Sequence, residues 1–150
     1  MRVVIQRVKE ASVSVENKVI SEIEKGFLIL LGIEGNDSEE DINWLVQKIA
    51  KLRVFGDEEG AMNQSILDVA GDVIVVSQFT LHASVKKGNR PSFIKAARPE
   101  IAIPLYEQFV IQLQKVLGRK VQTGEFGAMM DVGLINDGPV TILIDSKNKE

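Results

Sequence analysis

The sequence DVIVVSQFTL (residues 72–81) decides the fold of this chain, and the other segments are arranged around it. Its first half holds four β-branched apolar residues, Val73 to Val76, a pattern typical of a strand buried on both faces. Its second half places an amide and two hydroxyls at the end of this rigid element, where polar groups can be held toward a ligand. Continued strand alternation predicts two faces, one with Gln78, Thr80 and His82 and the other with Ser77, Phe79 and Leu81. The alternative is that the hydroxyls only bond neighbouring backbone.

Upstream of this stretch, alternating or continuous apolar patterns predict strands over residues 2–8, 11–16, 19–23 and 26–33. Asp37 or Ser38 can cap a helix whose first turn is acidic and whose apolar residues follow helical spacing to Leu52. A short strand is expected at 53–55, followed by a turn at 56–60.

Downstream, residues 83–98 contain five basic residues and no acidic one, and Gly88, Asn89 and Pro91 predict a loop there. A second helix is expected with Pro104 in its first turn and Gly118 at its end. Strands are predicted around residue 121 and over 130–135 and 140–145, with a turn at 136–139 and a frayed tail from 146. These elements predict one domain, residues 1–150, of the α+β class, with a β-barrel or sandwich of mixed sheets and two main helices.

Composition excludes several classes of protein. The absence of Cys removes disulfides and thiolate zinc sites, and a net charge of −3 argues against a general electrostatic grip on nucleic acid, DNA included. A local basic patch remains compatible with a small RNA contact. No signal peptide and no run of about 18 apolar residues is seen, so we expect a cytoplasmic protein without a membrane partner.

Common catalytic signatures are missing. His82 is the only histidine and the carboxylates show no ligand spacing, so no metal is expected. No Gly-x-Ser-x-Gly elbow surrounds Ser77, and the glycines match no phosphate loop, so no nucleotide cofactor is expected either.

Four motifs together resemble the D-aminoacyl-tRNA deacylase family: SQFTL at 77–81, KGNRPSF at 87–93, TGEFGAMM at 123–130 and NDGPVT at 136–141. The start MRVVIQRV and the run GFLILLGI resemble that family as well, so the similarity extends over nearly the whole chain.

The resemblance implies a homodimeric barrel that hydrolyses the ester between a D-amino acid and the 3′ end of tRNA, and also removes glycine from tRNA. It needs no cofactor and serves proofreading in translation. It further implies that Gly138 and Pro139 form a cis peptide that reaches into the site of the other subunit, opposite the SQFTL strand. Main-chain oxygens would then hold the substrate ammonium, while an L side chain would meet the pocket wall.

The resemblance also implies roles for individual residues. The catalytic residues would be Ser77, Gln78, Phe79 and Thr80. An unactivated threonine is a poor nucleophile, so two routes stay open: a Thr80 side-chain role, or activation of water by the ribose 2′-hydroxyl with backbone N–H groups near Phe79 and Thr80 stabilising the oxyanion.

Substrate contacts are implied for Phe126 and Met129, which as common core fillers have an equally good structural interpretation, and for Arg7, which would support the Gly138–Pro139 loop. Lys86, Lys87 and Arg90 would meet tRNA phosphates. Two other functions remain: an RNA-end binding module without hydrolysis, and a threonine hydrolase of small esters.

Overall fold

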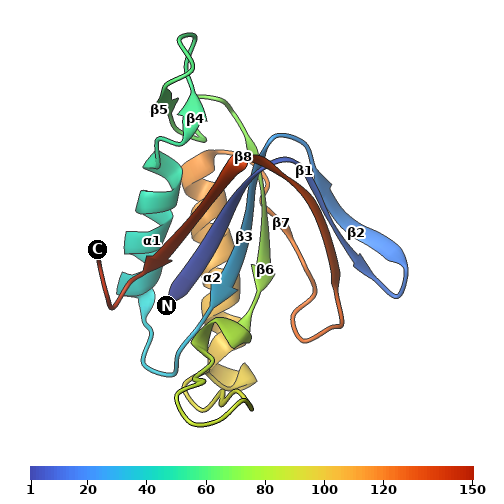
Figure 1. Cartoon of the computed structure of the whole chain (residues 1–150), viewed down its shortest axis with the longest axis vertical. Coiled ribbons are helices and arrows are strands. Elements are labelled where there is room, and N and C mark those ends of the chain that lie inside the picture. Colours follow the sequence, from blue (N-terminus) through green and yellow to red (C-terminus); the bar gives the residue numbers. More distant parts are fainter.

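The computed structural model describes residues 1–150, and its longest strands form one curved sheet (Figure 1). Strand β1 (Arg2–Val15) organises this sheet because it pairs with three others, all antiparallel: β3 (Gly26–Gly32) along its first half, β2 (Lys18–Ile23) along its second half, and β8 (Asp131–Asp145) on its other edge. Strand β3 pairs in parallel with β6 (Asp72–Ser77), which pairs in parallel with β7 (Gln122–Thr123).

The sheet curls until its two ends approach each other. The hydroxyl of Ser21 in β2 donates to the carbonyl of Thr123 in β7, and a small apolar cluster fills the inside of the curl. This cluster consists of Val8, Ala11, Val13, Ile23, Leu28, Ile74 and Val76. The predicted α+β, barrel-like class with two main helices is confirmed.

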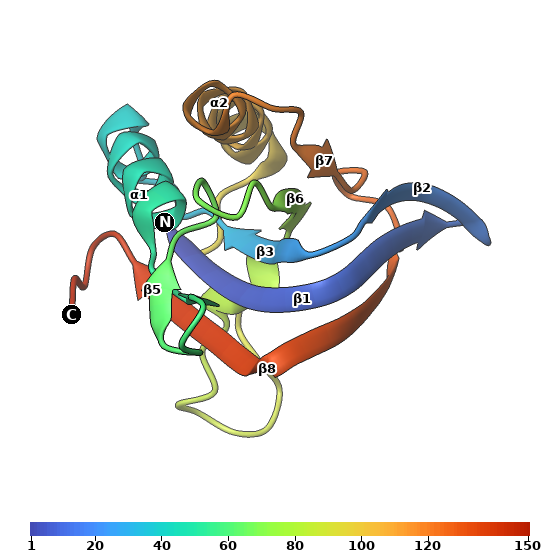
Figure 2. The ribbon, with the colours of Figure 1, turned by 90° about the horizontal axis from the view of Figure 1, so that it is seen from above.

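Both helices lie on the same side of the sheet, and β8 is farthest from them (Figure 2). Helix α1 (Glu39–Lys51) begins after Ser38, as predicted, and α2 (Pro99–Leu117) ends at Gly118, whose φ of 67° lies in the left-handed region that glycine adopts readily. The prediction that Pro104 lies in the first turn of α2 was wrong. Pro99 occupies the first turn, where no backbone donor is needed, and Pro104 lies inside the helix.

The smaller elements are β4 (Phe55–Gly56), β5 (Met62–Gln64) and the 3-10 turn η1 (Phe79–His82). The two strands β4 and β5 pair with each other, apart from the main sheet. No helix is long and apolar enough to cross a lipid bilayer.

Two pairs of predicted strands are continuous in the structure. Residues 2–8 and 11–16 belong to β1, and 130–135 and 140–145 belong to β8, because the two long strands pair with each other over most of their length. The segment Asn136–Pro139 is therefore not a hairpin turn. Asn136 pairs with Val8 and Thr141 pairs with Gln6, so residues 137–140 bulge out of the ladder opposite the single residue Arg7. The Gly138–Pro139 bond within this bulge is cis.

The predicted strand alternation over residues 77–82 was also wrong. Strand β6 ends at Ser77, opposite Leu31 near the end of β3, and the chain then turns into η1. The turn is closed by Leu81 N–H donating to the Gln78 carbonyl at 3.2 Å and by Ala83 N–H donating to the Thr80 carbonyl at 3.0 Å. His82 is consequently buried rather than sharing a face with Thr80.

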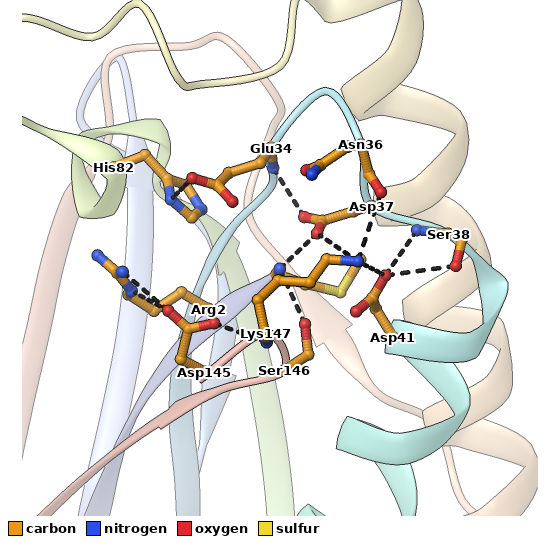
Figure 3. A network of polar contacts seen from close by, with 11 residues as sticks. Arg2, Glu34, Asn36, Asp37, Ser38, Asp41, His82, Asp145, Ser146 and Lys147 are labelled. Carbon is orange, nitrogen blue, oxygen red and sulfur yellow. Dashed lines mark hydrogen bonds and ion pairs between the residues drawn. The ribbon is translucent and has the colours of Figure 1, made fainter. Parts of the chain in front are cut away.

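The start and end of the chain meet in a polar network beside α1 (Figure 3). The ammonium of Met1 forms an ion pair with Asp37 at 2.5 Å, and both groups are buried. The ammonium also donates to the Ser146 hydroxyl at 3.0 Å. Asp41 accepts from Ser38 N–H at 2.8 Å and from the Lys147 ammonium at 2.8 Å. The predicted fraying of the tail is therefore wrong for its first two residues.

The pKa of Asp41 is held well below its ordinary value. Burial of the carboxyl opposes this shift, but hydrogen bonds from Lys147, Ser146 and the Ser38 backbone outweigh it because they favour the charged form.

Candidate active site

A pocket of about 490 Å³ opens at the carboxyl end of β6. Its walls come from four parts of the chain: the β6–η1 junction, the end of β3, the start of α2 with the end of the loop before it, and the segment that leads into β8 together with the start of β8. These contribute Val76, Ser77, Gln78, Phe79 and Thr80; Leu31 and Ile33; Ala97 and Ala102; and Phe126, Gly127, Ala128, Met129, Met130 and Val132.

The pocket unites two of the sequence motifs although nearly 50 residues separate them. All four residues predicted as catalytic, Ser77 to Thr80, line it, together with Phe126 and Met129. The parallel pairing of β6 with β7 explains this, because Gly124 N–H donates to the Val75 carbonyl at 3.2 Å and so starts the second motif beside the end of β6.

The hydroxyl of Thr80 accepts a hydrogen bond from the side-chain amide of Gln78. No histidine or carboxylate lines the pocket, so the lining holds no side-chain base for this hydroxyl. The N–H groups of Phe79 and Thr80 precede Leu81, the first residue whose N–H is bonded within the turn. As in any helical turn, these first donors lack a partner inside the turn and are free for a developing negative charge.

Aromatic contacts fix the apolar wall. Phe126 is half-buried and stacks edge-on against Tyr106 of α2, with ring centroids 5.7 Å apart, and the Tyr106 hydroxyl donates to the Val75 carbonyl at 2.7 Å. Burial raises the pKa of Tyr106, which therefore stays neutral. Met129 is 91% exposed at the rim of the pocket, so it is not a core residue. Phe126 does pack against the larger buried apolar cluster, which includes Val75 and Tyr106.

Sequence reasoning missed two aromatic side chains at the site. Phe93 packs edge-on against Phe79, with centroids 5.1 Å apart, and Tyr106 supports Phe126 from behind. Phe93 lies within the motif at 87–93, whereas Tyr106 lies in α2, outside all four motifs. No local signal distinguishes such residues from ordinary packing.

Arg7 lies against the bulge of β8, as the resemblance implied. Its guanidinium Nε is 3.2 Å from both the carbonyl and the carboxylate of Asp137, and Nη1 donates to the Val54 carbonyl. A Cβ added at Gly138, where φ is +119°, would lie 2.5 Å from Nη2 of Arg7. The side chain is only 13% exposed, so it is a structural contact rather than a free surface arginine.

The bulge and the pocket lie at opposite ends of β3 within one chain. Arg7 pairs with Phe27 at one end of β3, whereas Ser77 pairs with Leu31 near the other. Four residues of extended strand span about 13 Å. Gly138 and Pro139 therefore do not line the pocket of their own chain.

The basic loop 83–98 runs beside the pocket without lining it, apart from Ala97. Lys86, Lys87 and Arg90 are all exposed, and the loop is pinched where Ser84 and Ser92 exchange backbone hydrogen bonds at 2.8 and 2.9 Å. No group of three His, Cys, Asp or Glu side chains is placed to hold a metal.

The family model and the curated relatives that match this chain are all described as tRNA deacylases. Residues 4–145 match the family described as D-Tyr-tRNA(Tyr) deacylase. Proteins called D-aminoacyl-tRNA deacylase from Flavobacterium psychrophilum and from Bacteroides fragilis strain YCH46 are each 65% identical over 150 residues, with both chains covered completely.

Two solved structures have similar folds. One, named c-Myc DNA Unwinding Element Binding Protein, has 43% identity and a TM-score of 0.92, covering 97% of this chain and 98% of that one. The other is described as a probable eukaryotic D-amino acid tRNA deacylase; it has a TM-score of 0.81 and covers 95% of this chain and 97% of that one. With 19% identity, it is alike in fold alone.

Proposed function

The chain belongs to the D-Tyr-tRNA(Tyr) deacylase family, and we propose that it is a homodimeric, cytoplasmic proofreading enzyme whose site is completed by the second subunit. Its family and its relatives make the chain a D-aminoacyl-tRNA deacylase, a hydrolase of the ester bond of aminoacyl-tRNA. The observation that carries the proposal is the pocket in which Ser77 to Thr80 meet residues 126–130 without the Gly138–Pro139 bulge.

In this proposal the aminoacyl ester sits against η1, and water attacks its carbonyl carbon. The N–H groups of Phe79 and Thr80 stabilise the oxyanion that forms, and the ribose 2′-hydroxyl orients or activates the water. Support comes from the position of these two donors before the first bonded donor of the turn and from the absence of a base beside Thr80. Phe126 and Met129 contact the terminal adenosine or the aminoacyl group.

The chirality filter is assigned to the partner subunit. Its Gly138–Pro139 bulge would enter the pocket and offer main-chain oxygens to the substrate ammonium, so that an L side chain meets the wall and a D side chain points to solvent. The position of the bulge against Arg7 suits this role, and its distance from the pocket of its own chain supports a contact made between subunits. Glycine, which has no side chain to exclude, is accepted as well.

A comparison of substrates tests the chemistry. Purified protein with a metal chelator present is incubated with D-tyrosyl-tRNA, L-tyrosyl-tRNA and glycyl-tRNA, and the remaining ester is measured. We expect rapid loss of the D-tyrosyl and glycyl esters and persistence of the L-tyrosyl ester. Binding of tRNA without hydrolysis would indicate a binding module, and equal hydrolysis of esters lacking RNA would indicate a general esterase.

Thr80→Ala separates the two catalytic routes. Because the proposed oxyanion donors are backbone groups, this variant should lose less than the roughly 100-fold that removal of one oxyanion donor costs. Near-complete loss would assign the chemistry to the Thr80 side chain instead.

A mixing experiment tests completion by the partner. One variant, Gly138→Val, spoils the bulge, and another, Ala128→Trp, fills the pocket; each homodimer should be inactive. A heterodimer of the two has one site in which both parts are intact. Because half of randomly mixed dimers are heterodimers, about a quarter of the wild-type rate should return after unfolding and refolding together. Absence of any recovery would show that each subunit works alone.

A further inference from the structure

A second pocket, of about 430 Å³ and polar in character, lies at the other end of the η1 turn. Whereas Phe79 and Thr80 line the apolar pocket, His82, the last residue of the turn, lines this one. Its charged lining is dominated by cations: Arg2, Lys86 and Lys95 against the single carboxylate of Glu34. Such a balance favours an anion.

Arg2 provides donors that are already fixed in direction. Its Nε and Nη2 donate to the Asp145 carboxylate at 3.0 and 2.8 Å, and its Nη1 donates to the Leu81 carbonyl at 2.7 Å. A guanidinium has five N–H donors, so two remain, and the side chain is 33% exposed. Figure 3 shows the guanidinium held by Asp145 on the same side as His82. Asp145 offsets part of the charge but leaves these two donors and their geometry in place.

The two lysines complete the pocket from opposite arms of the basic loop. The Ser84–Ser92 bridge draws the arms together, so Lys86 follows one bridge residue and Lys95 the other. Both lysines are exposed and neither forms an ion pair, whereas Glu34 faces His82, with its Oε1 3.2 Å from Nδ1 of the ring (Figure 3). The ammonium groups of these two lysines are therefore unpaired, and cations outnumber carboxylates in the pocket lining.

We propose that this pocket binds a backbone phosphate of the single-stranded 3′ end of the tRNA, one or two nucleotides before the terminal adenosine. The assignment rests on the proposed function, because the adenosine itself is placed in the apolar pocket. The arrangement supports it: Thr80 and His82 are two residues apart in one 3-10 turn, a rise of about 4 Å, so the two pockets adjoin and neighbouring nucleotides of one strand can reach both. Arg2 and both lysines thus fix the register of the RNA, and the Arg2–Leu81 bond joins this grip to the catalytic turn.

The test compares three substrates that differ in their phosphates: D-tyrosyl-adenosine, which has none, the D-tyrosyl ester of the trinucleotide CCA, and D-tyrosyl-tRNA. For the double variant with Lys86→Ala and Lys95→Ala, we expect KM for the trinucleotide and for tRNA to rise about fivefold or more, with kcat unchanged. The dependence of log(kcat/KM) on log[salt] should become shallower by about 0.7. Hydrolysis of D-tyrosyl-adenosine should not change.

A variant of opposite sign sharpens the test. Glu34→Gln keeps the shape of the side chain but removes the only carboxylate that lines this pocket, so KM for the trinucleotide should fall. Lys115→Ala removes an exposed lysine from the last turn of α2 and serves as the matched control, with no change for any substrate.

The other outcomes overturn the inference. An effect seen with tRNA but not with the trinucleotide would place the lysines on the acceptor stem, and an equal effect on D-tyrosyl-adenosine would mean that they only support the fold. No effect on any substrate would leave the pocket without a phosphate. Failure of the wild-type protein to hydrolyse all three D-tyrosyl esters would instead refute the proposed function, which is a distinguishable result.

Discussion

Replacing Arg7 by lysine should uncouple the Gly138–Pro139 bulge from the sheet. The guanidinium makes contacts to the Asp137 carbonyl and carboxylate and to the Val54 carbonyl, and it is largely buried. A lysine ammonium keeps the charge but cannot satisfy partners on two segments with the same fork. We therefore expect the loss of at least one charge-assisted hydrogen bond, about 1.5 to 3 kcal/mol of unfolding free energy.

For Arg7→Lys, the expected change in Tm is small and the expected change in kcat/KM is large, so the two effects can be told apart. For a chain of this length, a loss of about 2 kcal/mol lowers Tm by roughly 4 to 8 °C, so the variant stays folded at 25 °C. Displacement of a substrate-positioning group by about 1 Å costs on the order of 100-fold in rate. The variant should therefore show a modest fall in Tm together with a fall of about 100-fold in kcat/KM for D-tyrosyl-tRNA.

Arg53 offers a matched control for this experiment. Its Nε and Nη2 donate to the carbonyl and side-chain oxygen of Asn63 at 2.8 and 3.1 Å, a similar fork on an exposed segment away from the pocket. Arg53→Lys should change Tm and kcat/KM little. If Arg7→Lys retained full activity while Tm fell, the bulge would have no part in catalysis, and the reasoning would be refuted.

Three further variants test the fold. Gly26→Ala should fold poorly, with reduced soluble yield and Tm, because the new Cβ would overlap the backbone of Asp72 in the parallel ladder. Tyr106→Phe should cost about 0.5 to 1.5 kcal/mol in urea unfolding, since the Val75 carbonyl keeps a second donor; a loss above about 3 kcal/mol would contradict this. The pKa of Asp41 is lowered on folding, so its stabilising effect is present above its unfolded pKa near 3.8 and is lost as pH falls below that value. Asp41→Asn should accordingly lower the urea midpoint at pH 7 and reduce its fall between pH 5 and pH 3.

Local patterns in the sequence predict the elements whose environment is uniform. The apolar runs of β3 and β6 are covered on both faces and were identified, as was α1, whose capping residue and apolar stripe agree with each other. The end of β6 was misjudged because residues 78–82 contain no glycine, proline or asparagine that signals a turn. The strand stops there because β3, its parallel partner, stops too, and that is information from elsewhere in the chain.

The same limit applies to the site. The motifs at 77–81 and 123–130 meet because β7 lies beside β6, a pairing of two residues on each strand that no periodicity reveals. The resemblance to a family predicts the residues within these two motifs. Only the structure shows that Tyr106 packs behind Phe126 and that Phe93 packs against Phe79. The resemblance implies a cis bond before Pro139, and the structure has one. The residues alone predict a turn at 136–139, because the pairing of β8 with β1 on both sides of this segment is a long-range feature.

The lining of the apolar pocket supports the proposal that a second subunit contributes to selection at the α-carbon. A D-aminoacyl ester brings an ammonium that must be desolvated to be held, and an unpaired buried charge is costly. The pocket offers no carboxylate, and its side-chain oxygens, on Ser77, Gln78 and Thr80, all come from the wall on which the ester carbonyl is proposed to lie. If the pocket recognised the amine from that same wall, its opposite face would stay open. The substrate side chain could then turn outward in either enantiomer, so both D and L substrates would be accepted. In the proposed dimer, discrimination would use acceptors on the facing side, and the bulge of the second subunit would supply them, because the bulge held by Arg7 does not line the pocket of its own chain.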